Sequence, residues 1–196
     1  MANKSIYFLA LRPNLLEEAQ LLTHLNSWAP GMISKKSNPF FIQVSDLFQC
    51  SEDSVFDLGK EFQKYAQLTN SFSLNFHNLI IQPLKEEVLM EVQLNDQISS
   101  IHAQITKLIR ENRTIERTPQ FSITPHFHMT VISKGECLMN FSSISNALNR
   151  NFKSFSYNQD TISLMEFNGQ AWCEKFFFPL CNKSRSAKSI SSKPIH

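Results

Sequence analysis

A pair of strand-like segments near the end of the chain constrains the fold more than any other feature of the sequence. Residues 154–166 and 170–180 have the character of strands, and they turn at Asn168-Gly169. An Asn-Gly pair between two such segments is a strong β-hairpin signal, because the tight turn needs positive φ angles that these residues adopt at low cost. The hairpin favours antiparallel pairing in the sheet to which it belongs.

The rest of the chain alternates short apolar strands with amphipathic helices. Its order is strand–helix–strand–helix–strand–strand, followed by helix–strand–helix–strand–strand, with no exact internal repeat. Strands are expected at residues 6–11, 40–44, 72–76 and 88–94 and within 121–132, and helices after Asn14, after Ser51 or Asp53, after Asp96, and around 141–150. This order predicts an α+β protein of two similar lobes.

Composition excludes several classes of protein. Apolar residues make up 42% of the 196 residues and charged residues 18%, which is enough to bury a core and unlike a disordered polymer. No apolar run approaches the length of a membrane span, and no secretory signal is recognisable. The chain has 17 Phe and 4 Gly and lacks both Gly-rich phosphate-loop motifs, so nucleotide-binding folds built on those loops are disfavoured.

Cysteine spacing and charge bear on metal sites, disulfides and the kind of partner. The four cysteines are scattered, with no C-x-x-C pair, so we predict neither a zinc site nor a disulfide framework, and a cytoplasmic location with reduced thiols is the default. Residues 1–180 are expected to form a single domain, and residues 181–196 a disordered basic tail. That tail has four basic and no acidic side chains, so the net charge of +2 for the chain becomes −2 for residues 1–180. Overall charge therefore gives no case for a nucleic-acid partner of the domain.

The most informative segment for function is Thr124-Pro125-His126-Phe127-His128-Met129-Thr130. In a strand, alternation sets His126, His128 and Thr130 on one face and the apolar residues between them on the other. Imidazoles exchange protons near neutral pH, and a neighbouring hydroxyl can hold a phosphoryl oxygen. The pattern also fits a surface strand whose histidines only form hydrogen bonds, and the residues alone leave both interpretations open.

The segment His128-Met129-Thr130 follows a proline in the second half of the chain and resembles the second H-x-T signature of the 2H phosphoesterases. The most similar branch is that of the LigT-like RNA 2',3'-cyclic phosphodiesterases, also called 2'-5' RNA ligases. Residues 6–13, 88–94 and 160–180 resemble strands of that family in order and spacing. The resemblance implies two pseudo-symmetric lobes with antiparallel sheets around a central groove and helices on the outside. It also implies one H-x-T strand from each lobe, with one histidine as general acid, the other as general base, the threonines on the phosphate, and no metal or other cofactor.

The first H-x-T signature is degenerate in this chain. It should fall in the second strand, after a basic loop, where the sequence reads Phe41-Ile42-Gln43-Val44. By that register Phe41 replaces the histidine and Gln43 replaces the threonine. Gln43 can still form a hydrogen bond with a phosphate oxygen, whereas Phe41 cannot move a proton. The other histidines of the first half, His24 and His77, do not fall in a matching strand.

The second signature has two possible registers. The first, His128-Met129-Thr130, keeps the whole motif, whereas the second keeps the Pro-His pair at Pro125-His126 and sets His128 where threonine belongs. We favour the first, so His128 and Thr130 are the predicted catalytic residues, with His126 assisting. The predicted substrate-binding residues around the groove are Gln43, Phe41, Arg12 and Lys134.

These residues predict one of three functions. The first is a metal-independent cyclic phosphodiesterase, a hydrolase for RNA or nucleotides with 2',3'-cyclic phosphates or 2'-5' linkages, impaired by the loss of one histidine. The second is an inactive relative that binds RNA or nucleotide in the groove, and the third is a protein-interaction domain whose groove is unused. A monomer without membrane contact is expected. Trp172 could stack a base and the basic residues of 107–117 could steer RNA, although a hydrophobic closing strand and a solvated helix face explain them more simply.

Overall fold

The computed structural model describes residues 4–33, 39–117, 127–133 and 135–181. Its strands are β1 (Lys4–Leu11), β2 (Ile42–Gln43), β3 (Phe48–Ser51), β4 (Phe72–Gln82), β5 (Glu87–Val92), β6 (Glu116–Arg117), β7 (His128–Ile132), β8 (Phe155–Gln159), β9 (Thr161–Phe167) and β10 (Trp172–Pro179). Its helices are α1 (Leu15–Trp28), α2 (Glu52–Leu68), α3 (Asp96–Glu111) and α4 (Phe141–Asn151).

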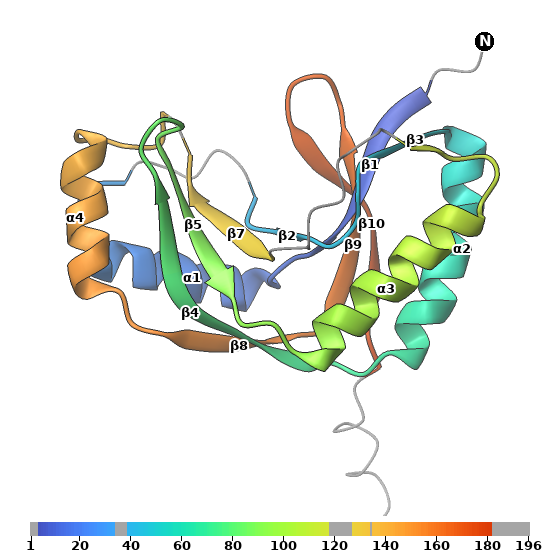
Figure 1. The fold of residues 1–196 in the computed structure, drawn as a ribbon, viewed down its shortest axis with the longest axis horizontal. Coiled ribbons are helices and arrows are strands. Elements are labelled where there is room, and N and C mark those ends of the chain that lie inside the picture. Colours follow the sequence, from blue (N-terminus) through green and yellow to red (C-terminus); the bar gives the residue numbers. More distant parts are fainter. Residues whose placement is uncertain (1–3, 34–38, 118–126, 134, 182–196) are drawn as a thin grey trace, which may run out of the picture.

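The strands form one curled antiparallel sheet in the order β10-β9-β1-β2-β7-β5-β4-β8, and β3 pairs with both β1 and β6. The β4–β5 and β9–β10 hairpins rise on either side of the short central strands β2 and β7 (Figure 1). The predicted α+β class with a groove lined by the sheet is confirmed. Two lobes are joined edge to edge through β2 and β7, because these two strands pair with each other.

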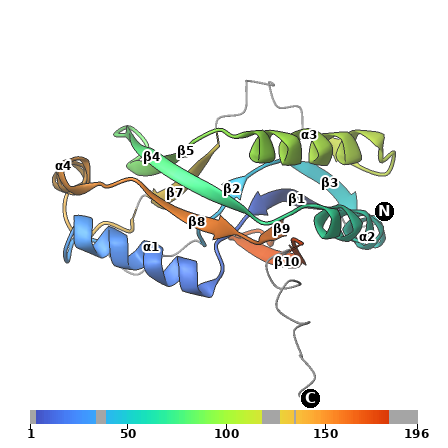
Figure 2. The ribbon, with the colours of Figure 1, turned by 90° about the horizontal axis from the view of Figure 1, so that it is seen from below.

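Each lobe takes segments from both halves of the chain, so the lobes are not the two similar halves of the sequence. In one lobe α1 packs against α4 and β8, where the ring of Trp28 lies 5.0 Å from that of Phe152, just after α4, and 5.9 Å from that of Phe155 of β8. In the other lobe α2 lies against β10, with the rings of Phe62 and Phe178 6.1 Å apart. Figure 2 shows α1 and α3 on opposite sides of the central strands.

Three of the four helices begin where the sequence predicts. Asn14 caps α1 through a reciprocal capping box with Glu17, Ser51 caps α2, and α4 matches the predicted 141–150 within one residue. The cap of α3 is Asn95, whose side chain accepts a hydrogen bond from the backbone of Ile98, and the predicted cap Asp96 is the first helical residue. No described helix is long and apolar enough to cross a membrane.

The closing hairpin is confirmed, but the strand that precedes it is not continuous. Gly169 has φ 95°, and the backbone of Asn168 donates a hydrogen bond to Ala171 across the turn. The expected strand 154–166 divides at Asp160 into β8, which pairs with β4, and β9, which pairs with β1 and β10. The chain crosses from one lobe to the other at this point, because β8 and β9 lie in different parts of the sheet.

Other boundaries also differ from the prediction. The strand expected at 40–44 contracts to Ile42–Gln43, and the short strands β3 and β6 were not predicted. Cys181, assigned to the tail, is tied to the fold because its backbone bonds to Thr69 and Ser71. The rest of the predicted tail lies outside the described residues.

Candidate functional site

The junction of the two lobes is a single antiparallel pair. Ile42 of β2 lies directly opposite Met129 of β7, and both side chains are fully buried in the main core. Because side chains alternate along a strand, the residues that flank this pair point to the other face of the sheet, which lines the groove. The junction therefore positions four side chains, two from each strand, on the floor of the groove.

The four side chains are Phe41, Gln43, His128 and Thr130. The antiparallel register sets Phe41 beside Thr130 and Gln43 beside His128. An antiparallel pair has a local two-fold axis, and this axis exchanges Phe41 with His128 and Gln43 with Thr130. The backbone positions that carry His-x-Thr on β7 therefore carry Phe-x-Gln on β2.

Phe41 belongs to a small apolar cluster on the groove face, separate from the main core. In this aromatic shelf, Phe41 packs on Phe8 with ring centroids 5.1 Å apart, and Trp172 meets Phe8 edge-on at 4.5 Å. Phe8, Ala10 and Met165 are buried beneath them, so the shelf is a packed surface. On the β2 side the groove thus presents aromatic carbon where the related position on β7 presents an imidazole.

Arg12 lies next to the shelf and is held by carboxylates. Its guanidinium nitrogens lie 3.3 Å from Glu174 and 3.8 Å from Glu18, and Glu174 also accepts a hydrogen bond from the buried Ser163. A phosphate that used Arg12 would compete with two acidic side chains. The nearby amide of Gln43 donates to the backbone of Ser45 at 2.7 Å.

On the other side of the junction, polar side chains of β5 and β4 stand on the groove face beside His128. Glu91 lies directly opposite His128 in the β5–β7 register and opposite Asn78 in the β4–β5 register. Sequence reasoning did not single out Glu91, although it is the one carboxylate in the predicted strand 88–94. The signal was a charged residue in a strand that is otherwise apolar except for Gln93.

The remaining predicted residues are distributed as follows. His126 and Lys134 lie outside the described residues. His24 stacks on Trp28 at 5.5 Å, and a ring nitrogen of His102 lies 2.8 Å from the carbonyl oxygen of Val44, both on the side of the main core. Of the described histidines, only His77 and His128 lie on the groove face. Lys107 of α3 pairs with Glu111, as expected of a solvated helix face.

The ionisable groups behind the shelf, on the opposite face of the sheet, have structural roles. Burial raises the pKa of Tyr7 to about 12 and that of Cys50 to about 11. The Tyr7 hydroxyl donates to Glu166 at 3.0 Å, and Lys175 lies 3.3 Å from the same carboxylate. These hydrogen bonds outweigh desolvation and lower the pKa of Glu166.

Comparison with known proteins identifies the fold. No protein-family model and no curated protein sequence matches the chain. Among solved structures, E. coli LigT in its apo form superposes with a TM-score of 0.60 at 10% identity, over 92% of this chain and 99% of LigT. E. coli LigT complexed with 3'-AMP gives 0.57 at 12% identity, and TT0787 of Thermus thermophilus gives 0.55 at 11%, each over 91% of this chain and 99% of the other. The chain thus has the two-lobed LigT-like fold that the resemblance of its sequence implied.

Proposed function

We propose that the groove binds RNA or nucleotides that carry a 2',3'-cyclic phosphate or a 2'-5' linkage, and hydrolyses them slowly. The observation that carries the proposal is the Ile42–Met129 register, which sets His128 and Thr130 on the groove floor and makes Phe41 the two-fold counterpart of His128. The fold supports it, since E. coli LigT has been solved with 3'-AMP and with phosphate.

The chemistry needs two proton transfers. Water attacks the phosphorus, a new phosphorus–oxygen bond forms, and the bond to one ribose oxygen breaks. The water loses a proton and the leaving oxygen gains one. His128 protonates the leaving oxygen, Thr130 holds a non-bridging phosphate oxygen, and solvent accepts the proton from water. A positioned acid–base group contributes roughly 10²–10⁴ in rate, so the loss of one leaves a slow enzyme.

The aromatic shelf supports a place for the base. Phe41 lies beside Thr130, so a phosphate at Thr130 directs the rest of a nucleotide toward Phe41 and Trp172. Bases stack readily on exposed aromatic faces, with little dependence on sequence. In this proposal Gln43 and Arg12 contact the phosphate or sugar from the β2 side. Lys134 and His126, which follow and precede β7 in the sequence, assist from the other.

Binding without turnover is the second candidate. It is favoured by the packing of Phe41 on Phe8, which commits this position to apolar contact and leaves no proton-transfer group there.

The test is hydrolysis and binding of an RNA oligonucleotide that ends in a 2',3'-cyclic phosphate, in the presence of EDTA. We expect slow hydrolysis by the wild-type protein, its loss in His128→Ala, and binding within a few-fold of wild type in that variant. Binding by wild type without hydrolysis establishes the second candidate. Hydrolysis that survives His128→Ala contradicts the site, and absence of both activities rejects both functions.

A further inference from the structure

Polar side chains cross three neighbouring strands on the groove face beside His128. Glu91 of β5 is the cross-strand partner of His128 on one side and of Asn78 of β4 on the other. Met90, the next residue on β5, is fully buried and lies opposite Met129, which is also fully buried. The alternation therefore sets Glu91 and His128 on the same face, away from the core.

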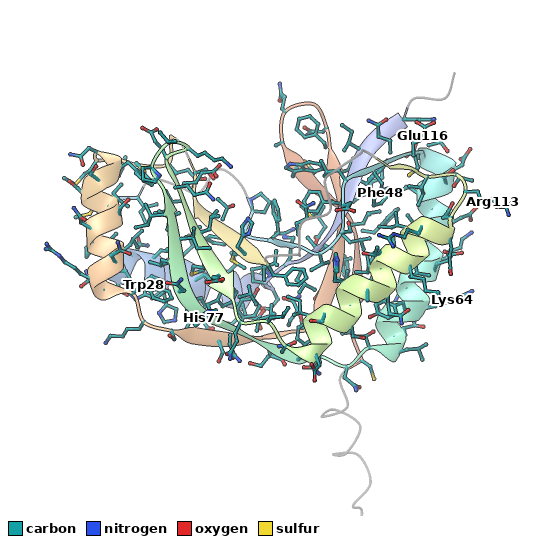
Figure 3. The ribbon with its side chains drawn as sticks, in the orientation of Figure 1. Trp28, Phe48, Lys64, His77, Arg113 and Glu116 are labelled. Carbon is teal, nitrogen blue, oxygen red and sulfur yellow. The ribbon has the colours of Figure 1, made fainter. Side chains whose placement is uncertain are left out.

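A β-bulge in β4 brings a second group to Glu91. The register of β4 against β5 shifts between Phe76 and Asn78, so the buried Phe76 faces the core while both His77 and Asn78 point to the groove face. The amide nitrogen of Asn78 donates to Oε2 of Glu91 at 3.2 Å. The Nε2 atom of His77 lies 3.7 Å from the same oxygen, and Figure 3 shows His77 on β4.

These contacts hold the Glu91 carboxylate from the side that faces away from His128. Both are made to Oε2, from the strand opposite to β7. Directly opposite residues in an antiparallel pair have Cβ atoms about 4.5–5.5 Å apart, a separation that a glutamate and a histidine side chain bridge with one hydrogen bond. A carboxylate beside an imidazole fixes which ring nitrogen bears the proton and how the ring is oriented.

We propose that Glu91 is a positioning residue for His128. Its carboxylate, anchored by Asn78 and His77, accepts a hydrogen bond from one ring nitrogen of His128 and directs the other nitrogen to the phosphate beside Thr130. The role in turnover rests on the proposed function, whereas the hydrogen bond between Glu91 and His128 can be tested without it. The polar side chains around Glu91 do not form a metal site, since no three His, Cys, Asp or Glu among the described residues are arranged to hold a metal ion.

The test reads the His128 ring directly. In ¹⁵N-labelled protein above pH ~8, where imidazoles are mostly neutral, the ring nitrogen resonances report which nitrogen carries the proton. We expect one tautomer of His128 in roughly tenfold excess in the wild type, as a hydrogen bond to a charged group provides. In Glu91→Ala the two tautomers become comparable, and in Glu91→Gln, which keeps an acceptor without charge, the excess is intermediate. His128→Ala identifies the resonances.

Glu87→Ala is the matched control, because Glu87 lies on the same strand, opposite Gln82, and its removal changes the net charge equally. An unchanged tautomer ratio in Glu91→Ala overturns the proposal, as does an equal change in Glu87→Ala. If the wild type hydrolyses the cyclic phosphate, Glu91→Ala lowers kcat by roughly 10- to 100-fold with little change in KM. If the wild type hydrolyses nothing, the proposed function fails, and the tautomer ratio still decides whether Glu91 positions His128.

Discussion

The two sides of the groove share one backbone arrangement and differ in chemistry. On β7, a histidine and a threonine flank the buried Met129, and Glu91 lies beside the histidine. On the β2 side, Phe41, just before the strand, and Gln43 flank the buried Ile42, and the phenylalanine extends an aromatic shelf. Symmetric strand pairing determines the positions of the side chains but not which residue types occupy them.

The two sides differ in what their side chains contribute: apolar burial on the β2 side and proton transfer on the β7 side. Burial of a phenylalanine side chain stabilises a fold by about 1.5–3 kcal/mol when it is complete, and the half-buried Phe41 gains part of this from Phe8. An imidazole at that position would be partly desolvated on the same surface. The β2 side is therefore expected to favour packing, and the β7 side proton transfer.

Introducing a histidine at position 41 should have the largest effect on the rate of hydrolysis. Phe41→His returns an imidazole to the two-fold counterpart of His128 and is expected to raise the rate of cyclic phosphate hydrolysis by roughly 10²–10⁴-fold. The measurement is single-turnover hydrolysis of the oligonucleotide used above.

Phe56→His is its control, since Phe56 lies on α2 and is 49% exposed. A folded Phe41→His variant with no gain would contradict the assignment of Phe41 to the missing histidine. A similar gain in Phe56→His would show that an added histidine acts without the groove.

A cavity under the β2–β7 pair should lower the free energy of unfolding more than a change at the surface does. Met129→Ala leaves a cavity under the β2–β7 pair and is expected to lower the free energy of unfolding by about 2–5 kcal/mol, measured in urea. Met139→Ala, at a position 51% exposed, should change it by less than about 0.5 kcal/mol. Equal effects of the two substitutions would mean that the junction is not a packed core.

Changes in the aromatic shelf should affect the binding of nucleotides. If it receives the base, Trp172→Ala weakens nucleotide binding by roughly 1–3 kcal/mol, the range for one stacked base. The protein has two tryptophans, so Trp28→Phe leaves Trp172 as the sole fluorescent reporter. Binding in Trp28→Phe should quench this emission at unchanged affinity, because Trp28 packs against Phe152 outside the groove. Full affinity in Trp172→Ala would remove the shelf from the binding site.

The smallest effect concerns the face behind the shelf. Burial raises the pKa of Tyr7 to about 12, with a further contribution from Glu166. The folded protein then retains a proton that the unfolded chain releases near pH 10, so the free energy of unfolding falls as pH rises from 10 toward 12.

Tyr7→Phe should remove this part of the alkaline fall and cost about 1 kcal/mol at neutral pH, through the lost hydrogen bond to Glu166. Denaturation curves across this pH range measure both. Tyr65→Phe is the control and should retain the fall that Tyr7 causes. An identical alkaline fall in wild type and Tyr7→Phe would show that Tyr7 does not hold its proton.

Sequence rules predict those parts of the fold whose signal lies within a few contiguous residues. The hairpin at Asn168-Gly169 and the caps Asn14 and Ser51 were predictable, since each depends on residues within a few positions. The division of residues 154–166 at Asp160 was not, because both resulting segments have the character of strands and only their partners at opposite ends of the sheet separate them.

The candidate site divides in the same way. Alternation alone sets His128 and Thr130 on one face of a strand, and the degenerate signature identifies Phe41 and Gln43 as their counterparts. Glu91 and His77 were not found, because a cross-strand neighbour depends on register and a bulge changes it within one strand.

By itself, the sequence determined the α+β class and the antiparallel closing hairpin, since hydrophobic periodicity and turn chemistry are properties of contiguous residues. Tertiary structure alone decided that each lobe draws on both halves of the chain, that Ile42 meets Met129, and that Glu91 stands beside His128. Those contacts join residues far apart in the sequence, and only the packing of the whole sheet selects their register.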